Sequence, residues 1–129
     1  MTKQHISAEL KKFIKEHIQT APKLEVLLLL HGRQSKSFSV EEVADELGFD
    51  SDTALEQLNA LQALDLVRAN ADKTQYRFHP VNSELSSLVD RLAIAYRKQR
   101  VSILSAILAE DANKHRRFVE AFKLVRTND

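Results

Sequence analysis

The sequence contains no cysteine, and its 129 residues include only two glycines and two prolines. Without cysteine the chain can form no disulfide, no redox-active thiol and no cysteine-based zinc site, which is compatible with a reducing compartment. Its glycines, Gly32 and Gly48, are too few for a glycine-rich loop that binds nucleotide phosphates. We therefore predict no nucleotide-dependent catalysis and no cofactor.

Long hydrophobic runs are also missing. The longest, residues 26–30, is far shorter than the roughly 20 apolar residues of a membrane-spanning helix, and the first residues have no apolar segment of the signal-peptide kind. The expectation is a soluble protein of the cytoplasm with no membrane contact. Hydrophobic residues make up 43% of the chain and charged residues 29%, a balance typical of one ordinary globular domain over residues 1–129.

Patterns of catalytic and metal-binding residues are scarce. The five histidines have no spacing typical of metal ligands, and His17 and His31 lie among apolar residues at helical spacing, which favours a hydrogen-bonded structural role. No serine lies in a nucleophile motif. Adjacent acidic residues lie on a polar helix face, so they give no support for acid–base catalysis. We predict that the protein is not an enzyme and holds no metal.

Two helices are expected before residue 33. Ser7 is placed to cap the first, over residues 7–19, whose apolar face repeats at helical spacing through Leu10, Phe13, Ile14, His17 and Ile18. The second helix is expected over residues 23–31. Pro22 suits its first turn, and Gly32 suits its C-terminal cap. Because the second helix is apolar around most of its circumference, we predict that it is the buried central helix.

The clearest local signals lie between positions 38 and 80. Ser39 and Glu42 form a capping-box pattern that starts a helix ending near Leu47, and Gly48 supplies a turn with positive φ. Asp50 is placed to cap a further helix, whose inward side chains are Ala54, Leu55, Leu58, Leu61 and Leu64. These signals predict two consecutive helices joined by a tight turn.

A hairpin and a long helix complete the expected chain. Alternating residues predict strands over residues 66–70 and 75–79, with Pro80 closing the hairpin. A helical pattern then covers residues 83–109, which without interruption would be roughly 40 Å long, more than a small domain can cover. Basic side chains at positions 97, 98 and 100 interrupt its apolar stripe. The pattern therefore leaves a continuous helix and a bent helix both open.

The apolar stripe of this last helix predicts a homodimer. Such a stripe must be covered by the first helix, by the end of the chain or by the same helix of a second copy. We assign residues 7–19 and 83–126 to helix packing and dimerisation. The residues expected to represent the dimer helix are Leu85, Leu88, Leu92, Tyr96, Ile103 and Ile107.

Residues 24–80 resemble the winged helix-turn-helix domain of bacterial regulators, and the whole layout is similar to the MarR or ArsR type. The resemblance rests on Leu47-Gly48-Phe49-Asp50, on Leu58-Asn59-Ala60-Leu61 with Leu66-Val67, and on Tyr76-Arg77-Phe78-His79-Pro80. These segments match the turn, the end of the recognition helix with the first wing strand, and the second wing strand. The resemblance implies a mainly α fold with a small two-stranded β-hairpin, in which N- and C-terminal helices form a dimerisation unit. It also implies a recognition helix that enters a DNA groove.

The charge of this region argues against DNA as the partner. Residues 37–67 contain eight acidic and no basic side chains, whereas the whole chain has a net charge of +1. Non-specific affinity for DNA comes mainly from Lys and Arg that neutralise phosphates, and carboxylates beside a polyanion add repulsion. The rest of the chain then carries about +9, so the acidic segment could face basic helices of this chain or of a second copy, or it could present its acids to a basic protein. We favour the last alternative and predict an acidic interaction face for a basic protein partner, formed by Glu41, Glu42, Asp45, Glu46, Asp52 and Glu56.

Two functions follow from these patterns. The leading prediction is a non-enzymatic regulatory winged-helix protein in transcriptional control that acts mainly through protein–protein contacts. The alternative is a sequence-specific DNA-binding regulator of the MarR or ArsR type, in which bases are read by Gln57, Asn59 and Gln62 and phosphates are held by Arg68, Lys73 and Arg77. A third reading leaves these charges simply solvated, as on many domains.

Overall fold

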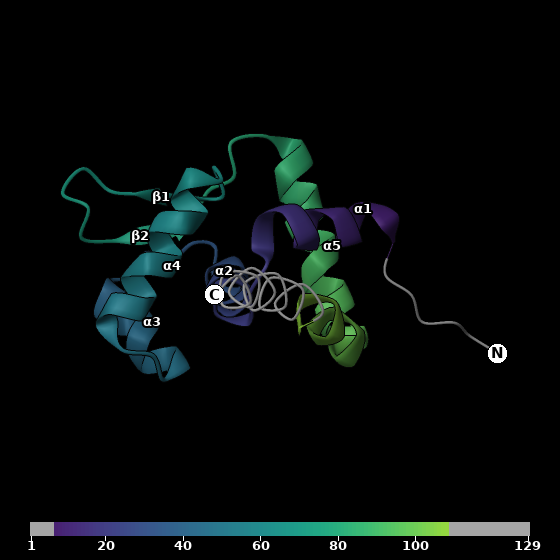
Figure 1. Cartoon of the computed structure of the whole chain (residues 1–129). Coiled ribbons are helices and arrows are strands. Elements are labelled where there is room, and N and C mark those ends of the chain that lie inside the picture. Colours follow the sequence, from purple (N-terminus) through teal and green to yellow (C-terminus); the bar gives the residue numbers. More distant parts are fainter. Residues whose placement is uncertain (1–6, 109–129) are drawn as a thin grey trace, which may run out of the picture.

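The computed structural model describes residues 7–108, which are mainly helical with one two-stranded antiparallel sheet (Figure 1). The elements in chain order are α1 (Ala8–Phe13), a π-helical turn η1 (Ile14–Ile18), α2 (Ala21–Gly32), α3 (Val40–Leu47), α4 (Ser51–Ala63), β1 (Val67–Ala69), β2 (Tyr76–Phe78) and α5 (Ser83–Lys98). A further helical run covers residues 100–108. The expected mainly α class with a small hairpin is confirmed. The part of the predicted dimerisation unit beyond residue 108 lies outside the described residues.

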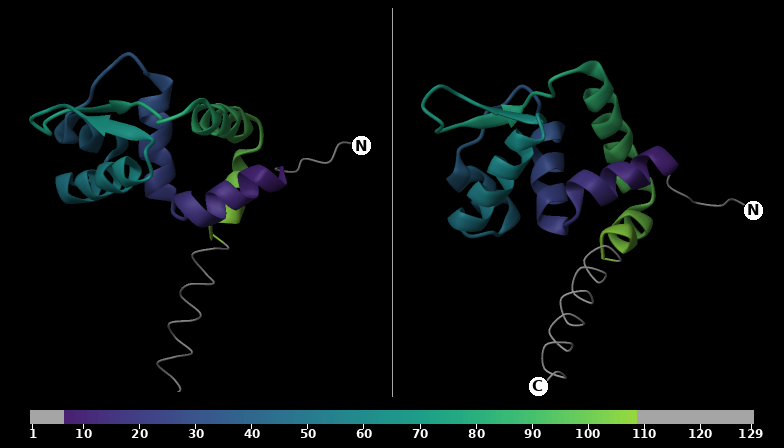
Figure 2. Two further views of the ribbon diagram at one scale, coloured as in Figure 1. Left: turned by 90° about the horizontal axis from the view of Figure 1, so that it is seen from above. Right: turned by 45° about the horizontal axis from the view of Figure 1, so that its top comes forward.

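Helix α2 lies at the centre of the arrangement. Figures 1 and 2 show α3, α4 and the hairpin on one side of α2, and α1 and α5 on the other. α2 contacts α3, α4 and β2 on the first side and α5 on the second, and α1 packs against α5. An ion pair of 2.9 Å between Glu9 and Arg91 also joins α1 to α5. The central helix therefore connects two groups of elements.

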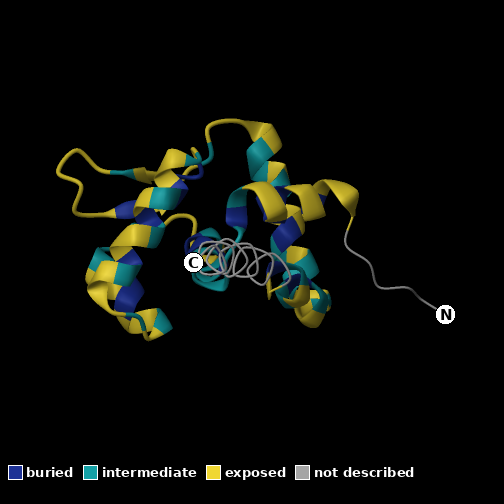
Figure 3. Cartoon of the chain, in the orientation of Figure 1, coloured by how far each residue is buried: buried dark blue, intermediate teal, exposed yellow. Residues whose placement is uncertain are grey.

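The core is built around the apolar side chains of α2. Figure 3 colours the ribbon by how far each residue is buried. The fully buried residues of this helix are Leu24, Val26, Leu27 and Leu30. Leu28 and Leu29 are only partly covered, and both pack against the core from its edge. The prediction of a central buried helix is confirmed.

The buried face of α4 is narrower than its leucine pattern predicts. Ala54, Leu58 and Leu61 are fully buried, and Leu64 is partly covered. The prediction that Leu55 faces inward is wrong, because its side chain is 38% exposed. Leu55 follows Ala54 by one residue, and one residue turns an α-helix by about 100°, which moves the side chain away from the core face.

Hydrogen-bonded caps determine where α3 and α4 begin. The Ser39 hydroxyl accepts a hydrogen bond from the Glu42 backbone N–H at 3.1 Å, and the Glu42 carboxylate accepts one from the Ser39 backbone N–H at 2.8 Å. The Asp50 carboxylate accepts a hydrogen bond from the Thr53 backbone N–H at 2.6 Å. Between the two helices Gly48 has a left-handed φ of 72°. The predicted capping box, turn glycine and Asp50 cap are all confirmed.

The ends of the first two helices differ from the prediction. Ser7 caps α1 as expected, but the chain then widens into the π-helical turn η1, and Gln19 stops it with a φ of 70°. α2 begins two residues earlier than predicted because the Thr20 hydroxyl caps it, and Gly32 is its last helical residue rather than its cap. Both differences move a boundary without changing the order of the elements.

The hairpin turns two arginines outward. β1 and β2 pair in an antiparallel register that places Arg68 opposite Arg77, and both side chains are exposed. Backbone hydrogen bonds of 2.7 and 2.8 Å between Phe38 and Tyr76 join the hairpin to the segment before α3. Both strands are shorter than predicted, but the predicted hairpin is confirmed.

The last helix bends at Gln99. α5 ends at Lys98, Gln99 has φ −134° and ψ 49°, and the helix resumes at residue 100. The break lies among the basic residues that interrupt the apolar stripe, so the bent alternative is the observed one. After the bend, Ile103 and Ile107 join the same buried cluster as Leu92. The bend therefore lets the far half of the helix fold back onto the chain's own core.

Candidate functional site

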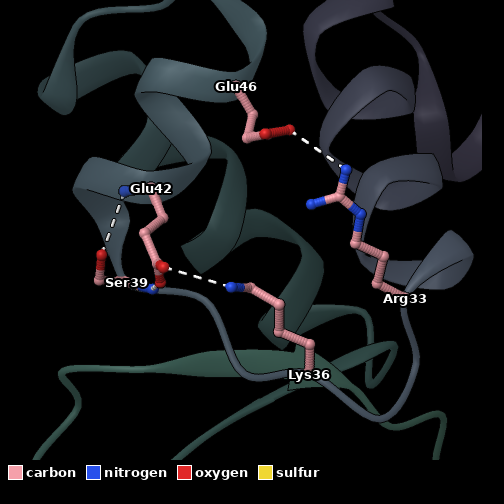
Figure 4. Close-up of polar contacts among 5 residues, drawn as sticks. All are labelled: Arg33, Lys36, Ser39, Glu42 and Glu46. Carbon is pink, nitrogen blue, oxygen red and sulfur yellow. Dashed lines mark hydrogen bonds and ion pairs between the residues drawn. The ribbon is translucent and has the colours of Figure 1, made fainter.

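Glu42 is the acid of the predicted face that serves the fold most directly. Besides completing the capping box with Ser39, its carboxylate lies 3.3 Å from the Lys36 ammonium (Figure 4). The hydrogen bond from the Ser39 backbone N–H, followed by the one from Lys36, lowers the pKa of Glu42. A carboxylate used in this way anchors the start of α3, and its charge is partly neutralised within the chain.

Glu46 is also paired within the chain. Figure 4 shows it directed toward Arg33, whose guanidinium is 3.4 Å from the carboxylate. Arg33 and Lys36 both belong to the connection between α2 and α3, so the two bases nearest α3 neutralise one edge of that helix. Glu42 and Glu46 are therefore separated from the remaining acids of the predicted face.

Four acids remain, which we call the acidic surface: Glu41, Asp45, Asp52 and Glu56. All four are exposed, and none has an ion-pair partner within residues 7–108. The first two are four residues apart on α3 and the last two are four residues apart on α4, and these helices pack against each other. Like charges at this helical spacing are destabilising by about 0.2–0.5 kcal/mol per pair. Repulsion between like-charged carboxylates therefore remains on the exposed sides of two adjacent helices.

The outer side of α4 carries no base to balance these acids. The sequence of α4, Ser51–Ala63, contains neither Lys nor Arg. Asp52, Glu56 and Asn59 are exposed at helical spacing, whereas Gln57 is half-buried. Asp50, at the start of α4, is a cap whose pKa is lowered by the hydrogen bond from the Thr53 backbone N–H. Of the predicted base-reading residues, Asn59 and Gln62 are exposed, and Asn59 lies beside the carboxylates of Asp52 and Glu56.

The hairpin carries the basic residues of the predicted DNA contact. Arg68 and Arg77 face each other across the strands, and neither has a carboxylate within ion-pair distance in the described part of the chain. Like charges directly opposite in a sheet are destabilising. The two arginines border a hollow of about 300 Å³, and Lys73 is exposed in the loop with a φ of 58°. Among the described residues, this pair of arginines is therefore a cationic site without a neutralising carboxylate.

The structure brings only part of the predicted DNA-contact set together. Gln62 and Arg68 border a second hollow of about 380 Å³ between the end of α4 and the hairpin, which Asp65 and His79 also border. Gln57 and Asn59 do not border this hollow or the one at the arginine pair. Of the expected base-reading residues, Gln62 alone therefore shares one of these two hollows with an expected phosphate-holding residue, Arg68.

The predicted dimer stripe faces the chain's own core. Leu92, Ile103 and Ile107 are fully buried within this single chain. Leu85 and Tyr96 are partly buried and pack against the same core cluster, as does Leu88. Most of this stripe is therefore already covered without a second copy.

A groove between α2 and α5 was not predicted from the sequence. It has a volume of about 620 Å³, and the residues along it are Leu28, His31, Gly32, Asp90, Ala93, Ile94, Tyr96 and Arg97. His31 Nε2 lies 2.8 Å from Asp90 Oδ1, and the His31 ring meets Phe78 edge to face at 5.1 Å. His31 is thus hydrogen-bonded and packed against an aromatic ring, as expected for a histidine among apolar residues. The signal for the groove is the spacing of Asp90, Ile94 and Arg97 on one face of α5.

Within residues 7–108 no group of three or more His, Asp or Glu side chains is arranged to hold a metal ion. No helix in the same range is long and apolar enough to cross a membrane. Compared with known proteins, the chain matches no family model, no curated protein and no solved structure.

Proposed function

We propose that this chain is a non-enzymatic regulatory winged-helix protein of transcriptional control, which acts as a homodimer through protein–protein contacts. In this proposal α3 and α4 are the helix-turn-helix, and β1 with β2 is the wing. The order of the elements supports this winged-helix assignment, as does the left-handed Gly48 in the turn between the helices. The proposed partner is a protein segment rich in Lys and Arg, bound at the acidic surface.

The observation that carries the proposal is the charge on the outer side of α4. In a helix-turn-helix protein that binds DNA, this is the side that enters the groove. Here Asp52 and Glu56 are exposed on it without a basic neighbour in α4. Phosphates approaching these carboxylates would be repelled, whereas a basic segment would be attracted. The same exposed helix therefore favours a cationic protein over a polyanion.

The intramolecular pairs of α3 strengthen this argument. Lys36 and Arg33 pair with Glu42 and Glu46, yet Glu41 and Asp45, on the helix that packs against α4, have no ion-pair partner within residues 7–108. Electrostatic complementarity of this kind mainly raises the association rate and selects the partner. We therefore expect contact at the acidic surface to weaken as salt rises, since exposed charges are screened.

The test is a fluorescence-anisotropy titration with a labelled arginine-rich peptide. Asp52→Asn/Glu56→Gln removes two charges from the acidic surface, and Glu16→Gln/Asp72→Asn removes two exposed charges elsewhere. The first double variant should lose most of the affinity and the control should keep it. Equal weakening by both variants would mean that the peptide senses only net charge, and the proposal would then fail.

One observation favours DNA binding as a second candidate function. Arg68 and Arg77 lie side by side without acidic partners in the described residues, as two phosphate contacts would. The test is anisotropy with a mixed-sequence duplex at low and physiological salt, repeated with Arg68, Lys73 and Arg77 replaced by Ala. Binding that falls with salt and disappears in the triple variant would favour this candidate. Absence of binding at low salt would remove it.

A further inference from the structure

The outer face of α5 has charges of opposite sign on either side of an apolar centre. Asp90, Ala93, Ile94 and Arg97 follow the i, i+3, i+4, i+7 spacing that places side chains on one helix face. All four border the groove between α2 and α5. Ile94 is 44% exposed, although it is a large apolar side chain at the middle of this face. We call these four residues the α5 face.

This arrangement is complementary to itself. If two α5 helices pack antiparallel about a two-fold axis between positions 93 and 94, Asp90 meets Arg97 of the partner subunit. The same axis places Arg97 opposite Asp90 of the partner subunit, and Ile94 opposite Ala93 of the partner subunit. A two-fold interface requires reciprocal pairs of this kind, because each residue contacts its counterpart in both directions.

We propose that the occupant of the groove is a second copy of this chain, docked through antiparallel α5 helices. The inference rests on the homodimer of the proposed function and identifies its contact face. Both charged groups are available for it. Arg97 has no acidic partner within residues 7–108, and Asp90 uses Oδ1 for His31 while its side chain remains 55% exposed. A carboxylate has a second oxygen that can accept a further charged hydrogen bond.

The groove floor leaves room for an apolar side chain from the second copy. Apart from its chain neighbours and its own helix backbone, a Cβ added at Gly32 would meet no heavy atom of residues 7–108 within 4 Å, so these residues leave the space above the end of α2 open. Leu28 is only partly covered and borders the same space. Ile94 of the partner subunit can enter this space and remove apolar surface of both copies from water. The groove thus supplies an apolar centre, and the two reciprocal charge pairs fix the direction of packing.

Charge reversal gives a direct test by sedimentation velocity over a wide concentration range. Asp90→Arg alone and Arg97→Asp alone each place like charges opposite one another in both reciprocal pairs. Each variant should therefore raise the dimer dissociation constant by about tenfold or more. In an equimolar mixture of the two variants every pair is again oppositely charged. We expect the mixture to form a heterodimer, although neither variant dimerises well alone.

A matched pair of substitutions tests the apolar centre. Ile94→Asp places a charge at the two-fold axis and should dissociate the dimer. Val81→Asp makes the same chemical change at a 63% exposed position in the loop before α5 and should leave the dimer intact. Asp90→Asn removes the charge of this side chain but retains a hydrogen-bond acceptor for His31. Circular dichroism checks that each variant is folded.

The outcomes separate this inference from the proposed function. Wild-type chain that remains monomeric at all concentrations would overturn the inference, as would a variant mixture that fails to associate. A monomer that takes up an apolar dye in the groove would assign the groove to a small ligand instead. The labelled arginine-rich peptide is titrated against the same variants, because none of them alters the acidic surface. A monomeric chain that still binds the peptide would contradict the dimer but not the binding of a basic segment at the acidic surface.

Discussion

The two glycines of the chain should respond to the same substitution with opposite signs. Gly48 connects α3 to α4 with a φ of 72°, whereas Gly32 ends α2 without a positive φ. At neither position would an added Cβ come within 4 Å of another heavy atom in the described part of the chain, the glycine's chain neighbours and its own helix backbone apart. Steric clash is therefore removed as a cause, and the backbone conformation decides the effect of replacing each glycine by alanine.

The magnitudes follow from that difference. An L-residue in the left-handed conformation costs about 1–2 kcal/mol, and the lower entropy of the unfolded chain with alanine returns about 0.4–1 kcal/mol. At the midpoints of these ranges, Gly48→Ala should therefore lower the free energy of unfolding by roughly 0.8 kcal/mol. Gly32→Ala gains from the same entropy, which is also the main reason for the higher helix propensity of alanine, and should raise that free energy by about 0.5 kcal/mol at a helix end.

The assay is urea unfolding followed by far-UV circular dichroism, with the wild-type chain and both variants measured together. The urea concentration at the midpoint should fall for Gly48→Ala and rise for Gly32→Ala. The slope of the unfolding free energy against urea concentration should not change. Gly48→Asn should lie between Gly48→Ala and wild type, since asparagine tolerates the left-handed region better. A Gly48→Ala variant as stable as wild type would refute the argument that this turn requires a left-handed residue.

Three further predictions concern acid, packing and the hairpin. The hydrogen bond from the Ser39 backbone N–H, at the cap of α3, is the main reason why the pKa of Glu42 lies below its ordinary value of 4.5. The stability that Glu42 contributes is therefore complete above pH 4.5 and is lost as the pH falls through the folded pKa. Glu42→Gln should therefore flatten the acid limb of unfolding free energy against pH. Leu58→Ala, at a fully buried site, should cost about 2–5 kcal/mol in urea unfolding, whereas Leu55→Ala, 38% exposed on the same helix, should cost less than about 1 kcal/mol. Arg77→Glu places a carboxylate opposite Arg68 and should raise the free energy of unfolding by about 0.2–1 kcal/mol, which thermal unfolding would show as a higher midpoint. This gain should shrink in high salt.

Local signals in the sequence were enough to predict the two consecutive helices. The capping box of Ser39 and Glu42, the turn at Gly48 and the cap at Asp50 all depend on residues within four positions of one another. Hydrogen bonds of such short range are determined by residue type and spacing, with little influence from the rest of the fold. The same holds for the hairpin, whose alternation is a property of adjacent residues.

Features that depend on distant residues could not be predicted. The pairing of Glu46 with Arg33 requires α3 to lie against the end of α2, which no local pattern states. The groove between α2 and α5 joins residues some sixty positions apart, as His31 and Asp90 show. The exposure of Leu55 depends on which neighbours cover α4, and the sequence pattern contains only its hydrophobicity. For the π-helical turn η1 we have no physical account in terms of residue type.

The acidic surface and the α5 face belong to different sides of the molecule. α3 and α4 lie on one side of α2 and α5 on the other, so docking through α5 would leave α3 and α4 uncovered (Figure 1). A homodimer would then present two acidic surfaces joined by a fixed contact. When one basic segment of a partner binds, the second surface is offered to the next segment at high effective concentration, provided that the spacing of the segments fits. Weak exposed charge contacts, each worth little alone, would in that case select partners with repeated basic segments.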